Sequence, residues 1–334
     1  MFRVYYMPKI ETCHVDKIYL ISFDIGGEIM AGFMVGEMIR RLRMQRGITQ
    51  EFLAYPYLER GHLSKIERGK TMPNKRTIEI LLERLGHNPK SFTVFYMDQK
   101  TAEIQSIMDE LEGYLKRRKI READALIARL EEDVEFTSND LYRQYLLSAK
   151  ASSAISKKED SDKIFDILRN AIMIGIPLFK EDDIEKYLLT KIDIELINMM
   201  AVVYCEDGHL EKSINLMYRL KENFDSRFVD NVSKGIHYPL VIYNLTKYLG
   251  MSERYKEAIK LCDAGKEVCL DISALRILPL IIMNKAACLY ELGDKKDCEK
   301  LLRQAYYASE MHERFDTTEE IKNYAEEKLG ITFL

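Results

Sequence analysis

Residues 36–54, GEMIRRLRMQRGITQEFLA, predict the start of a compact helical domain. Apolar residues at one-turn spacing indicate a helix from about residue 37 to residue 45: Met38, Ile39 and Leu42. The arginines between them are expected to face outward: Arg40, Arg41 and Arg43. Gly47 is suited to end this helix, and Thr49 to cap a second short one. The pattern therefore predicts two helices joined by a tight turn.

The stretch that follows, LSKIERGKTMPNKRTIEILLERLG at residues 63–86, predicts two more helices. Leu63 and Ile66 mark the buried face of the first, which Gly69 should close. Pro73 and Asn74 begin the second, whose apolar stripe consists of Ile78, Leu81, Leu82 and Leu85. Residues 34–92 are also basic, with twelve Lys or Arg against six Asp or Glu, whereas the whole chain has a net charge of −4. Such a charge asymmetry suits a polyanionic partner of this segment.

These residues resemble the Xre/Cro-type helix-turn-helix family of phage-repressor-like proteins. The Thr-Gln-Glu opening, the Leu-Ser-Lys-Ile-Glu-Arg-Gly run and the following proline carry the resemblance. It implies that the helix around residues 60–67 enters the major groove of double-stranded DNA, with Arg60 and His62 at base edges. The residues that would contact phosphates are Gln50, Ser64, Lys65, Lys70 and Asn74.

The alternative for each of these side chains is a solvated surface position, whereas Glu67 and Arg68 are expected to form local structural pairs. Two residues depart from the family pattern and bear on the geometry of base reading. Pro56 stands where the second helix normally ends, and Gly61 replaces a small polar residue in the recognition segment.

Residues 1–33 differ from the rest, because they show no sustained helical or strand period. Gly26-Gly27-Glu28 is what a purine-rich ribosome-binding sequence would encode, and Met30 follows at a suitable spacing. One hypothesis is that translation starts at Met30 or Met34, so that the segment is an over-called extension. The alternative is a short N-terminal strand or arm.

Residues 93–334 predict an all-α repeat domain, which completes an all-α fold. Helix pairs recur around Asn198, Asn244 and Asn284, and small residues, Ser213, Ala258 and Cys298, follow at spacings of 45 and 40 residues. Ala123 and Ile164 continue the series upstream. A second helix that packs tightly on the first requires a small residue at this position. The pattern resembles an array of about five tetratricopeptide (TPR)-type units, an α-solenoid.

A helix-turn-helix domain followed by such repeats resembles the Rgg/PlcR-like peptide-responsive regulators of Firmicutes, from residue 34 onward. The resemblance implies a homodimer whose repeat domain serves dimerisation and binds a short signalling peptide, as in quorum sensing. Candidate peptide-binding residues on the first helices of the units are Asn198, Tyr243, Asn244, Lys247 and Asn284. These asparagines could instead cap or bridge neighbouring helices.

Other classes find little support in the sequence. It has no apolar run long enough to span a membrane, no secretory signal and no CxxC pair, so a cytoplasmic protein with reduced cysteines is expected. Its six histidines are scattered, and no hydrolase, metalloprotease or nucleotide-binding motif occurs, so neither catalysis, a cofactor nor a metal is expected. The sequence therefore predicts a DNA-binding transcription regulator. The alternative is a non-catalytic scaffold whose repeats bind a protein partner.

Overall fold

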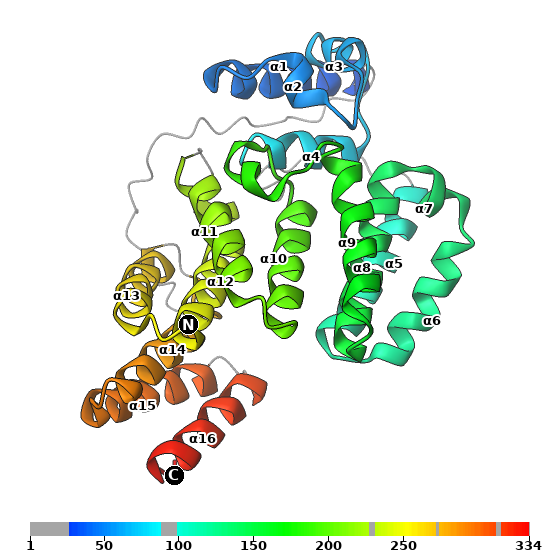
Figure 1. The fold of residues 1–334 in the computed structure, drawn as a ribbon. Coiled ribbons are helices and arrows are strands. Elements are labelled where there is room, and N and C mark those ends of the chain that lie inside the picture. The colour runs from blue at the N-terminus through cyan, green and yellow to red at the C-terminus, as the bar shows by residue number, and fades with distance from the viewer. Residues whose placement is uncertain (1–26, 88–98, 227–230, 272–273, 312–314, 334) are drawn as a thin grey trace, which may run out of the picture.

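The computed structural model describes residues 27–87, 99–226, 231–271, 274–311 and 315–333, and every regular element in these ranges is a helix. Figure 1 shows a small N-terminal bundle above a curved array of helix pairs. The fold is all-α, as predicted. None of the described helices is long and apolar enough to cross a membrane.

The N-terminal bundle consists of α1 (Gly27–Gln45), α2 (Gln50–Ala54), α3 (Arg60–Glu67) and α4 (Lys75–Arg84). The predicted turns are confirmed, since Gly47 and Gly69 have left-handed φ angles of +63° and +66°. Thr49 caps α2, because its hydroxyl accepts a hydrogen bond from the Phe52 amide at 3.1 Å.

The first helix begins earlier than predicted, at Gly27 instead of about residue 37. The sequence from residue 28 to residue 36 contains no proline, and its Glu, Met and Ala residues favour helix, so the helix extends backward. The hypothesis of an over-called start concerns residues 1–33: residues 1–26 lie outside the described residues, and residues 27–33 belong to α1, so a start at Met30 or Met34 would fall inside this helix.

The remaining helices form five antiparallel pairs within the described residues. They are α5 (Gln99–Lys116) with α6 (Ile120–Glu131), α8 (Asp140–Lys157) with α9 (Ser161–Gly175), α10 (Lys191–Glu206) with α11 (Leu210–Ser226), α12 (Asn231–Met251) with α13 (Tyr255–Asp271), and α14 (Leu278–Glu291) with α15 (Lys295–Met311). The short α7 (Val134–Ser138) and a 3₁₀ turn (Glu181–Lys186) lie between pairs, and α16 (Phe315–Leu329) follows the last pair. These are the TPR-like repeats that the sequence predicted.

Small residues lie where the two helices of a pair approach each other. Ser213, Ala258 and Cys298 have no exposed surface, and Ala123 of α6 is equally buried. The Ser213 hydroxyl donates to the Ala201 carbonyl oxygen of α10 at 2.8 Å. Packing therefore explains the recurrence of small residues along the sequence.

The described cysteines are free thiols. Four are buried, whereas Cys205 of α10 is partly exposed and contacts Met251 of α12 with a sulfur–sulfur distance of 3.9 Å.

Candidate functional sites

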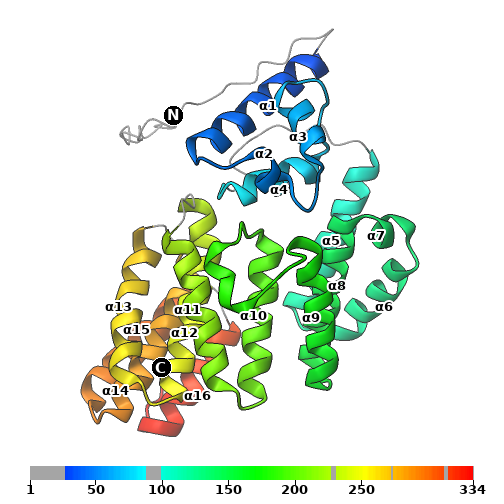
Figure 2. The same cartoon turned by 45° about the horizontal axis from the view of Figure 1, so that its top comes forward.

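The third helix of the N-terminal bundle has one buried and one exposed side. Leu63 and Ile66 are fully buried, whereas Arg60, His62 and Lys65 are exposed. In Figures 1 and 2, α4 lies on the side of the bundle that faces the repeats, and α3 lies farther from them. The basic side of α3 is therefore open to an incoming molecule.

A buried ion pair holds α3 against α1. Arg43 donates to the Glu67 carboxylate through Nε at 2.6 Å and Nη2 at 2.8 Å, and the Glu67 side chain is 1% exposed. The Gln50 amide donates to the same carboxylate at 2.7 Å. The expectation that Arg43 faces outward is therefore wrong, because its guanidinium satisfies a carboxylate that would otherwise be buried without a partner. Glu67 is paired as expected, but its partners lie 24 and 17 residues away in the sequence, so the pairing is not local.

The other predicted phosphate contacts have different surroundings. Lys70 is exposed and Ser64 is partly exposed. Asn74 is also exposed, but its side-chain oxygen caps α4 by accepting from the Thr77 amide at 2.8 Å. Arg68 donates from Nε to the Ser64 carbonyl oxygen at 3.0 Å, a local contact with backbone. Gln50 and Asn74 thus have structural roles in addition to any contact with DNA.

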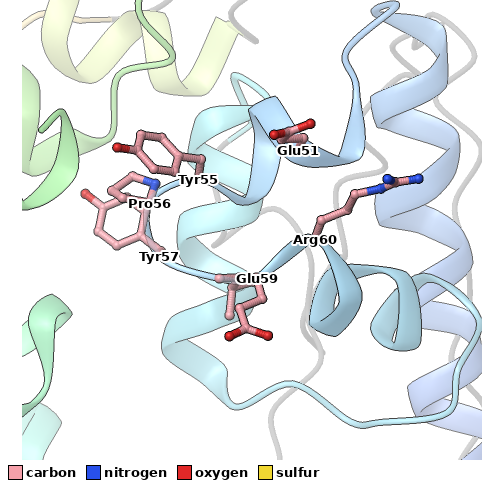
Figure 3. A pocket seen from close by; sticks show the side chains of 7 residues that line it. Glu51, Tyr55, Pro56, Tyr57, Glu59 and Arg60 are labelled. Atoms are coloured by element: carbon pink, nitrogen blue, oxygen red, sulfur yellow. The ribbon is translucent and has the colours of Figure 1, made fainter. Parts of the chain in front are cut away.

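Pro56 lies in the segment between α2 and α3, where a shallow depression of about 450 Å³ forms. Figure 3 shows the side chain of Tyr57, in the middle of this segment, and that of Arg60, the first residue of α3, pointing in different directions. Pro56 cannot donate a backbone hydrogen bond, but the carbonyl oxygens at the end of α2 are satisfied by Arg84. The Arg84 guanidinium donates to the backbone carbonyl oxygens of Phe52, Leu53 and Tyr55 at 3.1, 3.1 and 2.8 Å. Arg84, the last residue of α4, thus supplies hydrogen bonds to the end of α2 next to Pro56, the residue that departs from the family pattern.

The three predicted peptide-binding asparagines form a ladder across neighbouring first helices. The Asn244 amide donates to the Asn198 side-chain oxygen at 2.7 Å, which joins α12 to α10. The Asn284 amide donates to the Tyr243 carbonyl oxygen and to the Thr246 hydroxyl, both at 2.9 Å, which joins α14 to α12. These asparagines bridge helices, the alternative that the sequence left open. Their role in binding a peptide stays a prediction.

Two further candidate residues flank this asparagine ladder on α12. Lys247 is exposed, and Tyr243 is partly buried. Burial, together with the nearby Glu320 carboxylate of α16, raises the pKa of Tyr243 to about 12. The Tyr243 hydroxyl therefore remains a neutral hydrogen-bonding group at physiological pH.

A charged cluster that the sequence did not reveal lies at the first turn of α10. The Lys191 ammonium is 3.6 Å from carboxylate oxygens of both Glu112 and Glu195, and Glu112 also pairs with Lys116 at 2.7 Å. Burial, together with the positive charge of Lys191, lowers the pKa of His237 to about 4. These residues come from α5, α10 and α12, so only the packing of the repeats brings them together.

Comparisons with known proteins agree with this architecture. Residues 39–89 match the helix-turn-helix family HTH_3. The crystal structure of *Bacillus thuringiensis* PlcR in complex with the peptide PapR7 and DNA is similar, with 18% identity, a TM-score of 0.54, and coverage of 87% of this chain and 99% of PlcR. The apo form of the competence regulator ComR from *Streptococcus vestibularis* is similar at 14% identity and a TM-score of 0.50, covering 89% of this chain and 99% of ComR. No curated protein matches by sequence.

At these identities the structural likeness establishes the fold. The HTH_3 match independently covers the bundle that contains α3. Residues 39–89 are therefore an Xre-type helix-turn-helix domain of the HTH_3 family, joined to TPR-like helical repeats in a fold that resembles those of PlcR and ComR.

Proposed function

We propose that this chain is a sequence-specific DNA-binding transcription regulator that acts as a homodimer in the cytoplasm. The observation that carries the proposal is the exposed basic side of α3, with Arg60, His62 and Lys65, on a helix whose other side is buried. An α-helix fits the major groove of B-form DNA, where base edges differ in their donors and acceptors. PlcR, whose fold this chain shares, was crystallised with DNA.

Each predicted contact then has a role that its side chain can fulfil. Arg60 and His62, at the exposed start of α3, reach base edges. Those assigned to phosphates are Gln50, Ser64, Lys65, Lys70 and Asn74. Amide and hydroxyl groups can donate hydrogen bonds to phosphate oxygens, and the lysine ammonium groups add positive charge.

A short peptide bound beside the asparagine ladder would control DNA binding. The hydrogen bond between Asn198 and Asn244 uses the Asn244 amide nitrogen and the Asn198 side-chain oxygen, so a peptide could bond the other polar atom of each amide. Side-chain amides can bond the backbone of an extended peptide, with Tyr243, Lys247 and Asn284 beside them. PlcR was crystallised with a peptide, which supports the same class of ligand here.

The proposed division of labour places DNA binding in residues 34–92, and dimerisation and peptide sensing in residues 93–334. A peptide changes DNA binding only if it binds two arrangements of the dimer with different affinities. Under this proposal the protein responds to a signalling peptide whose concentration reports cell density, as in quorum sensing. The rival function, a protein-interaction scaffold, requires no DNA sequence preference.

Selection of duplexes from a random pool, followed by affinity measurements, separates these functions. The doubly substituted variant Arg60→Gln, Lys65→Gln should lose at least about tenfold in affinity for the selected duplex, because it lacks one base contact and one phosphate contact. The matched control is Arg118→Gln, Lys119→Gln, which removes the same charge from the exposed turn between α5 and α6. Equal affinities of the two variants would favour the scaffold.

A further inference from the structure

Three helices and the segment between α2 and α3 meet at Gly175, the last residue of α9. A Cβ atom at this glycine would lie 2.4 Å from the Tyr57 hydroxyl, 2.6 Å from an Asp193 carboxylate oxygen and 2.8 Å from the Gln144 amide nitrogen. Glycine costs about 1 kcal/mol relative to alanine inside a helix. The absence of a side chain at Gly175 is therefore explained by the polar groups that occupy its space.

These polar groups form one continuous chain of hydrogen bonds from the DNA-binding domain into the repeats. The Tyr57 hydroxyl donates to the Gln144 side-chain oxygen at 3.0 Å, and the Gln144 amide donates to Asp193 Oδ1 at 2.8 Å. Asp193 Oδ2 accepts from the amide and the hydroxyl of Thr190 at 2.9 and 2.8 Å. Gln144 and Asp193 are almost fully buried. Burial raises the pKa of Tyr57 well above its usual value, so the hydroxyl keeps the proton that it donates.

Further contacts surround this chain of hydrogen bonds, and two of them connect the same two domains. The Lys191 amide donates to the Glu83 carboxylate of α4 at 3.1 Å. Within the bundle, the Arg84 guanidinium lies over the Tyr57 ring, 5.6 Å from its centre. Leu188, which precedes α10, is 5% exposed and packs in the core of the helix-turn-helix bundle. The bundle is thus held on the repeats by both polar and apolar contacts.

The recognition side of α3 remains open while these contacts are made, because Arg60, His62 and Lys65 are exposed in the same structure. We propose that Tyr57, Gln144, Gly175 and Asp193 form a latch that fixes the orientation of α3 on the repeat domain, and that the latch thereby sets the half-site spacing that the dimer accepts. The effect on half-site spacing rests on the proposed function, whereas the latch does not. Two recognition helices can read half-sites one helical turn apart only when each is held at a defined angle, whereas loosely tethered domains accept several spacings.

The latch itself is tested by hydrogen exchange of the full-length protein. Tyr57→Phe removes only the hydroxyl, and Gly175→Ala places a methyl group among the three polar atoms. Both should speed exchange in α4 and in the first turn of α10, by roughly 3- to 10-fold for Tyr57→Phe, and leave α13 to α15 unchanged. The matched control is Tyr55→Phe, since Tyr55 is 55% exposed. If amides of α4 and α10 exchanged at wild-type rates in both Tyr57→Phe and Gly175→Ala, these residues would not hold the two domains together.

The consequence for spacing is tested with duplexes that carry two selected half-sites at different separations. The wild type and Tyr55→Phe should bind one separation best, whereas Tyr57→Phe and Gly175→Ala should bind several with affinities within about threefold of one another. Retention of a single preferred separation by variants whose latch has opened would overturn the role in spacing. Failure of the wild type to prefer any duplex would instead reject the proposed function, and the exchange experiment would still decide whether the latch exists.

Discussion

Replacing Arg43 with methionine should unfold the helix-turn-helix bundle while the repeats remain folded. The Glu67 side chain is 1% exposed and receives two hydrogen bonds from Arg43 and one from Gln50. In Arg43→Met only the bond from Gln50 remains. Removing one partner of a buried ion pair costs about 3–5 kcal/mol, because the remaining charge is left uncompensated.

That loss is comparable to the whole stability of so small a bundle. Domains are stable by roughly 0.05–0.15 kcal/mol per residue, so about 50 residues supply ~3–8 kcal/mol. Hydrogen exchange of the full-length variant should therefore speed up in α2 and α3 by roughly 100- to several-thousand-fold. Exchange in α13 to α15 should not change, since those helices lie apart from the bundle in both views of the fold (Figures 1 and 2).

The matched control is Arg43→Met combined with Glu67→Leu, which replaces both charges with apolar groups of similar size. Such replacements of buried pairs are often neutral or stabilising, so most of the protection should return. Wild-type exchange in Arg43→Met, or an equal loss of protection in the single and double variants, would show that the ion pair does not stabilise the bundle in this way.

Three further predictions concern the repeats, each measured by urea unfolding. The pKa of His237, about 4 against an ordinary 6.5, means that the unfolded state binds an extra proton between these values. Stability should therefore fall as the pH drops below about 6.5, by up to ~2 kcal/mol at pH 5, and His237→Gln should show less of this loss; identical pH profiles would contradict it. Ser213→Val should cost about 1–3 kcal/mol by overpacking α10 against α11, with Ser213→Ala as the milder control, and no difference between the two would argue against tight packing there. Asn244→Leu removes the bond to Asn198 and should cost about 1 kcal/mol, whereas Lys247→Leu on the same helix should cost less.

Much of the helix-turn-helix domain could be predicted because its signals are local. Thr49, Gly47 and Asn74 each act within three residues of their own position, so caps and turns are visible in a short stretch. The inward position of Arg43 was not visible, because its partner Glu67 lies 24 residues away. A run of arginines such as that at residues 40–43 predicts an exposed helix face, and only the packed structure shows that one of them pairs with the buried Glu67 carboxylate.

The repeats were also predictable, since small residues such as Ser213 and Ala258 recur with the period of the helix pairs. The bridging of helices by the asparagine ladder was one of two readings that the sequence left open. The latch could not be predicted, because Tyr57 and Gln144 are separated by 87 residues and meet only when the two domains pack. The one local signal was Gly175, a glycine in an otherwise apolar helical stretch.

Methylation protection of guanine N7 shows whether α3 lodges in the major groove of double-stranded DNA, because this atom lies in that groove. We expect two protected patches on a selected duplex, about one helical turn apart, and their loss in the variant Arg60→Gln, Lys65→Gln. Binding that leaves every guanine N7 in the duplex reactive would contradict it.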